Sequence, residues 1–432
     1  MRALHTSDWH LGHTLKEVNR EYEHRAFLQW LLATLQSEQP DLLLISGDVF
    51  DTATPSATAE QMWFGFLAAA RRQHPVMDIV VIAGNHDSPS RLAAPAPVLR
   101  ELNVSIVATV PRGADLQPQW QQLIVPVCGG RALVAAVPFL RAHDLAHFTE
   151  EELASGQRDV AMAYRRVKTA VRAVRQPTQP LFVMGHLYAA GGVTDSKSER
   201  PIAVGGQDSA PPSMFPKEAS YVALGHLHRG QKVYAEHVRY AGAPIPLAIE
   251  EANYHHHVVA IDVDDATLLA SIRQLPIPRA VDIIRIPKRG WGSVESVLAA
   301  ITALKDEVAG AAEALQPPPF VEVCVELDAP EPKLRAKIEA ALVGKAVRLI
   351  HIDRRNAGTG ETLQATANLR SLEQLTPIDV FEQLWRRNYG SEPSPEIRAA
   401  FAALHAEAAA ATVLAVDEAA PEATPVPKKV AP

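Results

Sequence analysis

Aspartate and histidine residues recur directly after apolar segments of this chain. The sequence opens MRALHTSDWHLGH, in which an apolar start leads into Asp8 and His10, two positions apart. Residues two apart in an extended segment project to the same side, which also holds for His226 and His228. The full set of such residues is Asp8, His10, Asp48, Asn85, His86, Asp87, His186, His226 and His228. Imidazole and carboxylate groups without thiolates suit Mn²⁺, Fe or Zn²⁺, so this set predicts a site for two metal ions.

Each of these residues alone has an ordinary explanation. A single aspartate or histidine after a strand is usually a cap or a hydrogen-bonded surface group. Five such pieces in series, each after an apolar run, are hard to explain by core packing alone. We therefore interpret the set as a functional site at one edge of a sheet.

Short apolar segments that alternate with helical periodicity must position this set. We expect helices at 23–37, 57–72 and 151–174, and buried strands at 41–51, 79–87, 132–138, 180–186, 220–228 and 257–263. Strands that are apolar throughout indicate a sheet covered on both faces, which is the layered α/β class. Ligands of such sheets bind beyond the carboxyl ends of the strands, where these polar residues stand.

Composition limits the class of protein. The chain has 432 residues, more than one hydrophobic core usually holds, so we expect at least two domains. It has no run of 18 apolar residues and no signal-peptide pattern, which predicts a soluble intracellular protein with no membrane partner. Cys128 and Cys324 lie far apart and are expected to be reduced and buried. The net charge of -7 argues against a general basic coat for nucleic acid but does not identify the substrate.

The spacing of the polar pieces resembles that of a known family. The motifs DxH, GDxxD, GNHD, GH and GHxH, at 8–10, 47–51, 84–87, 185–186 and 225–228, are similar to those of the calcineurin-like metallophosphoesterases. The segments LHTSDWHLG, ISGDVFD, GGQDSAPPSMFP, YVALGHLHRGQ and YAGAPIPLAIEE resemble more closely the SbcD-like nucleases, the nuclease subunits of bacterial SbcCD complexes. One departure is Gly242-Ala243-Pro244, where the family usually has Gly-Ser-Pro, so a hydroxyl near the site is missing.

The resemblance implies two divalent ions, with Mn²⁺ the expected metal. One ion would be held by Asp8, His10, Asp48 and His228, and the other by Asp48, Asn85, His186 and His226. Asp48 would then bridge them, and two cations about 3.5–4 Å apart need such a shared anionic oxygen to offset their repulsion. A hydroxide between the ions would attack phosphorus in line.

The resemblance also implies roles for the neighbouring residues. His86 is similar to the family histidine that stabilises the transition state or protonates the leaving oxygen, with Asp87 orienting it. Asp51 either supports a metal ligand or caps a helix, and the sequence does not separate these alternatives.

The fold class that follows is a layered α/β sandwich of the calcineurin-like type, with a small α/β capping domain and a C-terminal helical segment that binds a partner. We expect a nuclease domain at 1–275, the capping domain at 276–355, a linker at 356–375, the helical segment at 376–404 and a disordered tail at 405–432. Within the capping domain we expect strands at 281–286, 320–327 and 346–352, and helices at 293–314 and 331–342. Residues 331–355 hold seven basic and three acidic residues, an excess of 7 − 3 = 4. This excess predicts a DNA-backbone surface, although ordinary solvated helix charge explains it almost as well.

Two segments predict protein partners. Helix 57–72 is apolar on more than one face, so it is either a core helix or, together with 91–102, the homodimer interface through which SbcD-like nucleases pair. The segment 376–404 places Val380, Phe381, Leu384 and Trp385 on a short helix without a core of its own. The resemblance implies that this helix binds the SbcC ATPase, in a heterotetramer-type complex that acts on DNA in the cytoplasm, associated with the nucleoid.

Three functions are compatible with these residues. The first is a nuclease that works with SbcC in DNA repair, recombination and replication, as an ATP-dependent double-strand exonuclease and a single-strand or hairpin endonuclease. The second is a small-molecule phosphatase or phosphodiesterase with the same metal site, which would not need the appended basic domain and helical segment. The third is a non-catalytic scaffold, which we would expect to lack some of the seven ligands. The resemblance favours the first.

Overall fold

The computed structural model describes residues 1–145, 159–193, 210–306, 317–329, 331–356 and 377–404. The chain divides into two compact units, which we describe separately. The first unit comprises Met1–Val325 and Lys333–Asp353, and the second comprises Glu326–Pro332 and Arg354–Pro432.

Within the described residues, the strands of the first 280 positions form two six-stranded sheets and a small hairpin. The first sheet has the order β14-β13-β1-β4-β5-β6, in which β1, β4, β5 and β6 are parallel to one another and β13 pairs antiparallel with both β1 and β14. Its strands are β1 (Arg2–Thr6), β4 (Leu42–Ser46), β5 (Asp78–Ile82), β6 (Val104–Val107), β13 (His257–Val263) and β14 (Ala270–Pro276). The parallel strands end at the same edge, as the apolar segments followed by polar residues predict.

The second sheet has the order β11-β12-β10-β9-β8-β7 within the described residues. Strands β8, β9, β10 and β12 are parallel, while β7 and β11 are antiparallel edge strands. The strands are β7 (Ile124–Val127), β8 (Ala132–Ala136), β9 (Leu181–His186), β10 (Tyr221–Gly225), β11 (Gln231–Val233) and β12 (Ala235–Tyr240). The buried central strands β8, β9 and β10 carry the apolar runs that the sequence showed.

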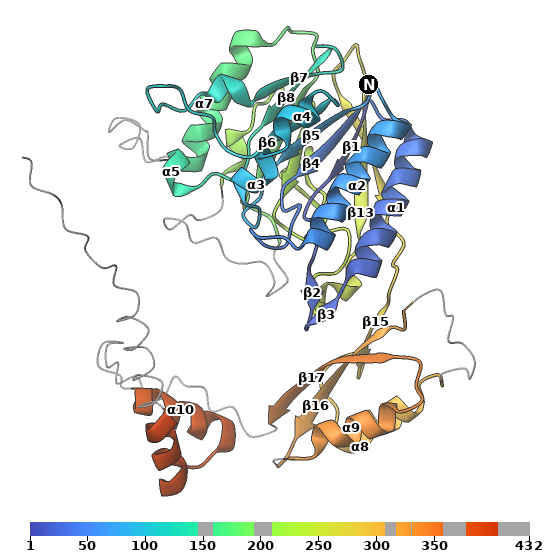
Figure 1. The fold of residues 1–432 in the computed structure, drawn as a ribbon, viewed down its shortest axis with the longest axis vertical. Helices are drawn as coiled ribbons and strands as arrows, with labels where there is room; N and C mark the ends of the chain where they lie inside the picture. Colours follow the sequence, from blue (N-terminus) through green and yellow to red (C-terminus); the bar gives the residue numbers. More distant parts are fainter. Residues whose placement is uncertain (146–158, 194–209, 307–316, 330, 357–376, 405–432) are drawn as a thin grey trace, which may run out of the picture. The chain divides into compact units, whose positions relative to one another are not determined.

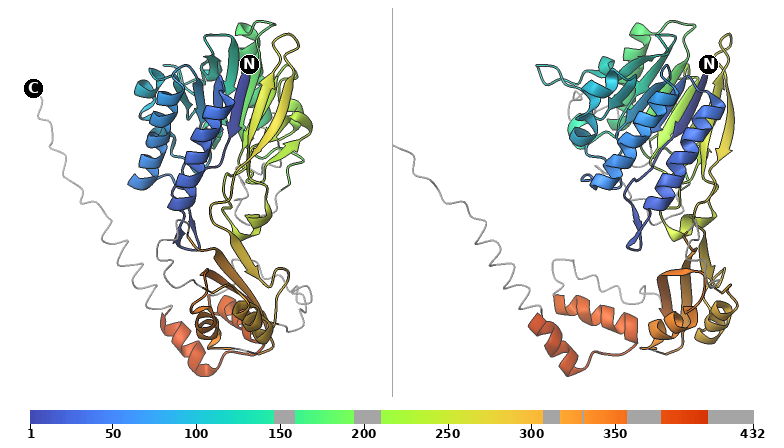
Figure 2. Two further views of the ribbon diagram at one scale, coloured as in Figure 1. Left: turned by 90° about the vertical axis from the view of Figure 1, so that its right-hand side faces the viewer. Right: turned by 45° about the vertical axis from the view of Figure 1, so that its right-hand side comes forward.

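The two sheets pack face to face, and helices cover their outer faces. Side chains of both sheets, such as Leu44 and Phe182, form the buried layer between them. The helices α1 (Glu21–Glu38) and α2 (Ala57–Gln73) pack on the first sheet and lie side by side, whereas α7 (Asp159–Val174) packs on the second (Figures 1 and 2). The expected layered α/β class is therefore confirmed.

The inner side of helix α2 packs in the core, where Met62, Trp63, Phe66 and Leu67 are all buried. Phe64 remains 40% exposed on its outer side. Short elements connect the layers: β2 (Thr14–Leu15), β3 (Val18–Asn19), α3 (Pro89–Ala93), α4 (Ala96–Arg100), η1 (Trp120–Leu123), α5 (Ala142–Leu145), η2 (Pro212–Met214) and η3 (Ile249–Asn253).

The following α/β segment has the expected order of elements, with three strands in the order β15-β16-β17 among its described residues. Its elements are β15 (Ile283–Ile286), α8 (Val294–Thr302), β16 (Phe320–Leu327), α9 (Leu334–Leu342) and β17 (Arg348–Asn356). The expected helix 293–314 is wrong in length, since α8 ends at Thr302. The ammonium group of Lys345 donates to the carbonyls of Thr302 and Leu304 and so satisfies acceptors at the C-terminal end of the helix. Residues 307–314 of that prediction lie outside the described residues.

In the second unit, α10 (Pro377–Tyr389) is followed by a further helical stretch at 395–404. The ring of Phe381 stacks on that of Phe401 with a centroid distance of 4.1 Å, and Trp385 lies against Tyr389. The expected linker 356–375 and tail 405–432 fall almost entirely outside the described residues. None of the described helices is both long and apolar enough to cross a membrane.

We predict that the substitution Gly225→Ala destabilises the sandwich. A Cβ atom at Gly225 would lie 1.9 Å from the carbonyl oxygen of Ser46, where β10 and β4 of opposite sheets approach each other. The expected loss is about 1–3 kcal/mol of unfolding free energy, measured by urea denaturation without metal. The matched control is Gly65→Ala in α2, where the added atom meets nothing within 4 Å. That change should raise the stability by about 0.5–1 kcal/mol, and equal stability of the two variants would contradict the prediction.

Candidate metal centre

The structure brings the predicted polar residues together at the carboxyl edge of both sheets. Asp8 and His10 follow β1, and Asp48 follows β4. The remaining members also stand at strand ends: Asn85, His86 and Asp87 follow β5, His186 is the last residue of β9, and His226 and His228 follow β10. Because β9 and β10 belong to the second sheet, the cluster is built from both sides of the sandwich.

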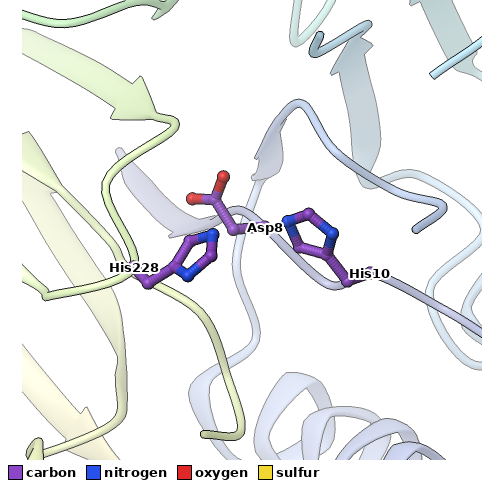
Figure 3. A group of neighbouring side chains, drawn as sticks. All are labelled: Asp8, His10 and His228. Carbon is purple, nitrogen blue, oxygen red and sulfur yellow. The ribbon is translucent and has the colours of Figure 1, made fainter. Parts of the chain in front are cut away.

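Two trios of these side chains have the geometry of ion sites. Asp8, His10 and His228 have ligand atoms within 4.8 Å of one another, and we call this trio site A. Asp48, His186 and His226 meet the same limit and form site B. In Figure 3, Asp8 and His10 project from one segment towards His228, which comes from another. A third trio, His10, Asp48 and His86, overlaps with both.

The backbone at these positions is strained. Asp8, His10 and Asp48 have φ angles of 54°, 46° and 49°, and His226 has a φ of 104°. Non-glycine residues rarely adopt this left-handed region, and such strain concentrates at functional sites. The absence of a side chain at Gly84 lets its backbone lie close to the carboxylate of Asp48, because a Cβ atom there would lie 2.1 Å from Oδ1 of Asp48.

The hydrogen bonds of His10 leave one of its nitrogens for a cation. Its Nδ1 donates to Oδ1 of Asp51 at 3.1 Å. Its Nε2 is buried and has no hydrogen-bond partner among the described residues, although Oδ2 of Asp48 lies 3.5 Å away. A ring that donates from one nitrogen to a carboxylate and leaves the lone pair of the other nitrogen available is typical of metal-ligating histidines. Asp51 therefore supports His10, which decides the alternative that the sequence left open.

His186 provides a second test of whether an ion fits. Its Nδ1 donates to the carbonyl of Ser46 at 2.9 Å, so Nε2 of the neutral ring carries the lone pair. That atom faces Oδ1 of Asn85 at 2.9 Å and Oδ2 of Asp48 at 3.3 Å. Three acceptors directed at one another repel unless a proton or a cation lies between them. The donor set of carboxylate, amide oxygen and imidazole suits a divalent ion.

The pKa values of the clustered side chains also favour a bound cation. Burial alone would lower the pKa of His186, but the carboxylates of Asp48 and Asp8 raise this pKa to about 9. Burial alone would raise the pKa of Asp48, yet the surrounding histidines, His186 foremost, hold it well below its usual range. Burial lowers the pKa of His10, and lowers that of His226 to about 3, so both rings are neutral and able to bind a cation.

Comparisons with known proteins place the chain in a family. Residues 1–230 match the family described as calcineurin-like phosphoesterase, and residues 279–389 match the type 5 capsule protein repressor C-terminal domain. The SbcD subunit of the SbcCD nuclease from Rhodobacter capsulatus is 38% identical over 387 residues, covering 88% of this chain and 93% of that protein. This chain belongs to the SbcD family.

Two further relatives agree with this. The SbcD protein of Escherichia coli K12 is 32% identical over 394 residues, covering 89% of this chain and 92% of its own length. The SbcD protein of Bacillus subtilis is 36% identical over 274 residues, covering 61% and 66%. As a member of the SbcD family, the chain is a metal-dependent enzyme of the nuclease type that hydrolyses phosphodiester bonds.

The expectation that Asp87 orients the His86 ring is wrong. The Asp87 carboxylate accepts hydrogen bonds from the backbone N–H groups of Val49, Phe50 and Gly84, which fixes the loops rather than the imidazole. The ring of His86 is instead held by the carbonyl oxygen of Asp51, which accepts from Nδ1 at 2.7 Å. A side chain that follows a histidine in sequence need not face it, because consecutive residues point in different directions.

Sequence reasoning missed three residues that support the centre of this SbcD-family chain. Glu251 is buried and accepts from Nδ1 of His228 at 2.9 Å. His13 lies 3.0 Å from Asp51, between Nδ1 and Oδ1. Arg141 donates to the carbonyl of Asp87 at 3.0 Å and braces the loop that carries Asn85 and His86. Glu251 stands in the family-like segment YAGAPIPLAIEE, but neither spacing nor periodicity linked it to a histidine.

We predict that Mn²⁺ binding to site B displaces a proton from His186. Below pH 9 the metal-free ring is protonated and must lose its proton before Nε2 can bind an ion. The affinity should therefore rise by up to about tenfold per pH unit from pH 6.5 to 8.5 and level off above pH 9. Calorimetric titrations in two buffers of different ionisation enthalpy measure the released proton. His186→Ala should abolish this release, and an affinity independent of pH in the unchanged protein would contradict the prediction.

Proposed function

We propose that this chain is the nuclease subunit of an SbcCD-type complex, with two Mn²⁺ ions at sites A and B. In this proposal it cleaves duplex DNA ends exonucleolytically, dependent on ATP, and cuts single-stranded and hairpin DNA in repair, recombination and replication. It would act on DNA in the cytoplasm, at the nucleoid. The observation that carries the proposal is the buried carboxylate of Asp48, which belongs to site B and lies 3.5 Å from Nε2 of His10 in site A.

The ligands assigned to the ions keep the expected division. Asp8, His10 and His228 would hold one ion and Asn85, His186 and His226 the other, with Asp48 shared. Bound ions would supply Lewis acidity and an activated water. The protein itself contributes positioning, since the oxygen of Asn85 lies within 3.2 Å of ring nitrogens of both His186 and His226.

His86 is the residue to which we assign proton transfer. Its Nδ1 donates to the carbonyl of Asp51, so Nε2 is the atom that exchanges a proton with the substrate. The ring is partly exposed, unlike those of the buried ligands His10 and His186, and so can reach the phosphodiester. Its centroid lies 4.7 Å from that of His10, so the ring stands beside an assigned ligand of site A.

The C-terminal regions support a nucleic-acid and a protein partner. We assign residues 276–355 to orienting DNA, although part of their basic excess is already paired: Arg335 with Glu339, Lys345 with Asp306 and Arg355 with Glu326. We assign residues 376–404 to binding the SbcC ATPase. The aromatic contacts of Phe381 and Trp385 support this, because they make the helices a firm platform, and Leu384 is 48% exposed on it.

A homodimer through residues 57–72 and 91–102 completes the proposed assembly. The exposed apolar residues of this region support it: Phe64 is 40%, Leu102 44% and Val98 69% exposed. Large apolar side chains left exposed on a protein surface are typical of an interface.

We predict that His86→Ala binds two Mn²⁺ ions but cleaves an end-labelled DNA hairpin about 10²–10⁴-fold more slowly. The loss follows from removal of the proton donor while all assigned ligands remain. Asp48→Ala, the matched comparison, should lose both activity and metal. Assays of the purified protein with and without SbcC and ATP test the full proposal. Inertness towards DNA combined with brisk hydrolysis of a small phosphodiester would favour the phosphatase alternative.

We predict that Leu384→Asp releases the chain from SbcC. A carboxylate on the platform would have to be desolvated against an apolar groove, so the complex should weaken at least tenfold in a co-purification or sedimentation assay. Leu116→Asp, at a leucine that is 67% exposed in the first unit, is the matched control. Equal loss of the complex in both variants would contradict the assignment.

A further inference from the structure

The two candidate ion sites are anchored to different parts of the first unit. In site B, His186 is tied through Nδ1 to the carbonyl of Ser46, at the end of the central strand β4. Neither Asp48 nor His186 has a hydrogen bond to residues 243–254 within the described part of the chain. Site A is different, because His228 is hydrogen-bonded to that loop directly and His10 is connected to it through Asp51 and His13.

The link from His228 to the loop is direct. Glu251 accepts from Nδ1 of His228 at 2.9 Å through Oε1, and from the backbone N–H of Leu247 at 2.8 Å through Oε2. The backbone N–H of Ala243 also donates to the carbonyl of His228 at 3.0 Å. Ala243 and Glu251 therefore hold His228 directly, and Leu247 helps to hold Glu251 in place.

The link from His10 to the loop runs through His13. Nε2 of His13 lies 2.9 Å from the carbonyl oxygen of Leu247, and its Nδ1 lies 3.0 Å from Oδ1 of Asp51. The same Oδ1 accepts from Nδ1 of His10 at 3.1 Å. Leu247 is thus held at its N–H by Glu251, the partner of His228. Its carbonyl contacts His13, which shares the carboxylate oxygen of Asp51 with His10.

The loop itself is fixed from its far side. The guanidinium of Arg20, which is fully buried, donates to the carbonyl of Pro246 at 2.8 Å and is paired with the buried carboxylate of Glu23. Ile249 packs with Leu15, Val281 and Phe320 in one apolar cluster. A segment held by a buried ion pair and an apolar cluster can keep its hydrogen-bond acceptors in place without the metal.

We propose that the loop 243–254 sets the metal affinity of site A, with His13 and Glu251 as positioning residues, and leaves site B unaffected. The inference rests on the proposed function, because it takes Asp8, His10 and His228 as metal ligands. Residues that orient a metal-bound imidazole from behind typically change metal affinity about 10–100-fold when removed. Site A therefore responds to a part of the chain that contributes no ligand of its own.

The test is a Mn²⁺ binding isotherm on the full chain, with no substrate present. His13→Ala and, separately, Glu251→Gln should weaken one of the two binding steps about 10–100-fold and leave the other within twofold. His255→Ala is the matched control, since this exposed histidine stands just after the same loop. It should change neither step. Unchanged isotherms in both test variants, or equal weakening of both steps, would overturn the proposal.

A second variant identifies the affected site. Asp8→Asn should remove the site A step, and adding His13→Ala to it should leave the remaining step unchanged. A further loss in the double variant would overturn the selectivity of the loop for site A. If Asp8→Asn still binds two ions as tightly as the unchanged chain, the ligand assignment of the proposed function fails. That failure is distinguishable, because it does not involve His13.

Discussion

The carboxylate of Asp48 is buried at the junction of the two sheets, and the rest of the centre is arranged around it. An ionised carboxylate in such a place is costly unless donors or cations compensate it. One oxygen accepts from the backbone N–H of His86 at 2.8 Å, and the other faces nitrogens of His10 and His186 at 3.5 and 3.3 Å. The carboxylate can occupy this position because Asp48 has a left-handed backbone and because Gly84 has no side chain beside it.

Both candidate ion sites span the sandwich. Site A takes Asp8 and His10 from the first sheet and His228 from the second, while site B takes Asp48 from the first and both histidines from the second. Contacts between the sheets, such as Nδ1 of His5 with the hydroxyl of Tyr221 at 3.0 Å, hold the two halves in register. Because ions that bind only the assembled edge stabilise the folded state, metal binding and docking of the sheets are thermodynamically linked.

The nuclease domain and the C-terminal regions contribute in different ways. The candidate metal ligands and His86 lie at the carboxyl edges of the two sheets. The small sheet of β15, β16 and β17 adds side chains to the cluster that contains Ile249, so its packing reaches the loop behind site A. Several basic residues of this α/β segment are paired with nearby carboxylates, so its net charge overstates the positive charge that it exposes.

Local sequence patterns were sufficient to predict the class of fold, the family and the set of residues at the carboxyl edge. Apolar runs that end in Asp, Asn or His identify strands and their functional ends, and such patterns can be recognised without knowledge of the fold. The same locality explains why the expected helix 293–314 is too long: the helix ends where its carbonyls meet Lys345, which is 43 positions away from Thr302 in the sequence. Only the folded chain shows that Asp51 supports His10, that Asp87 holds backbone rather than His86, and that Glu251 and His13 stand behind site A. These contacts depend on how loops from distant parts of the chain meet, and that is fixed by packing of the two sheets rather than by any spacing along the sequence.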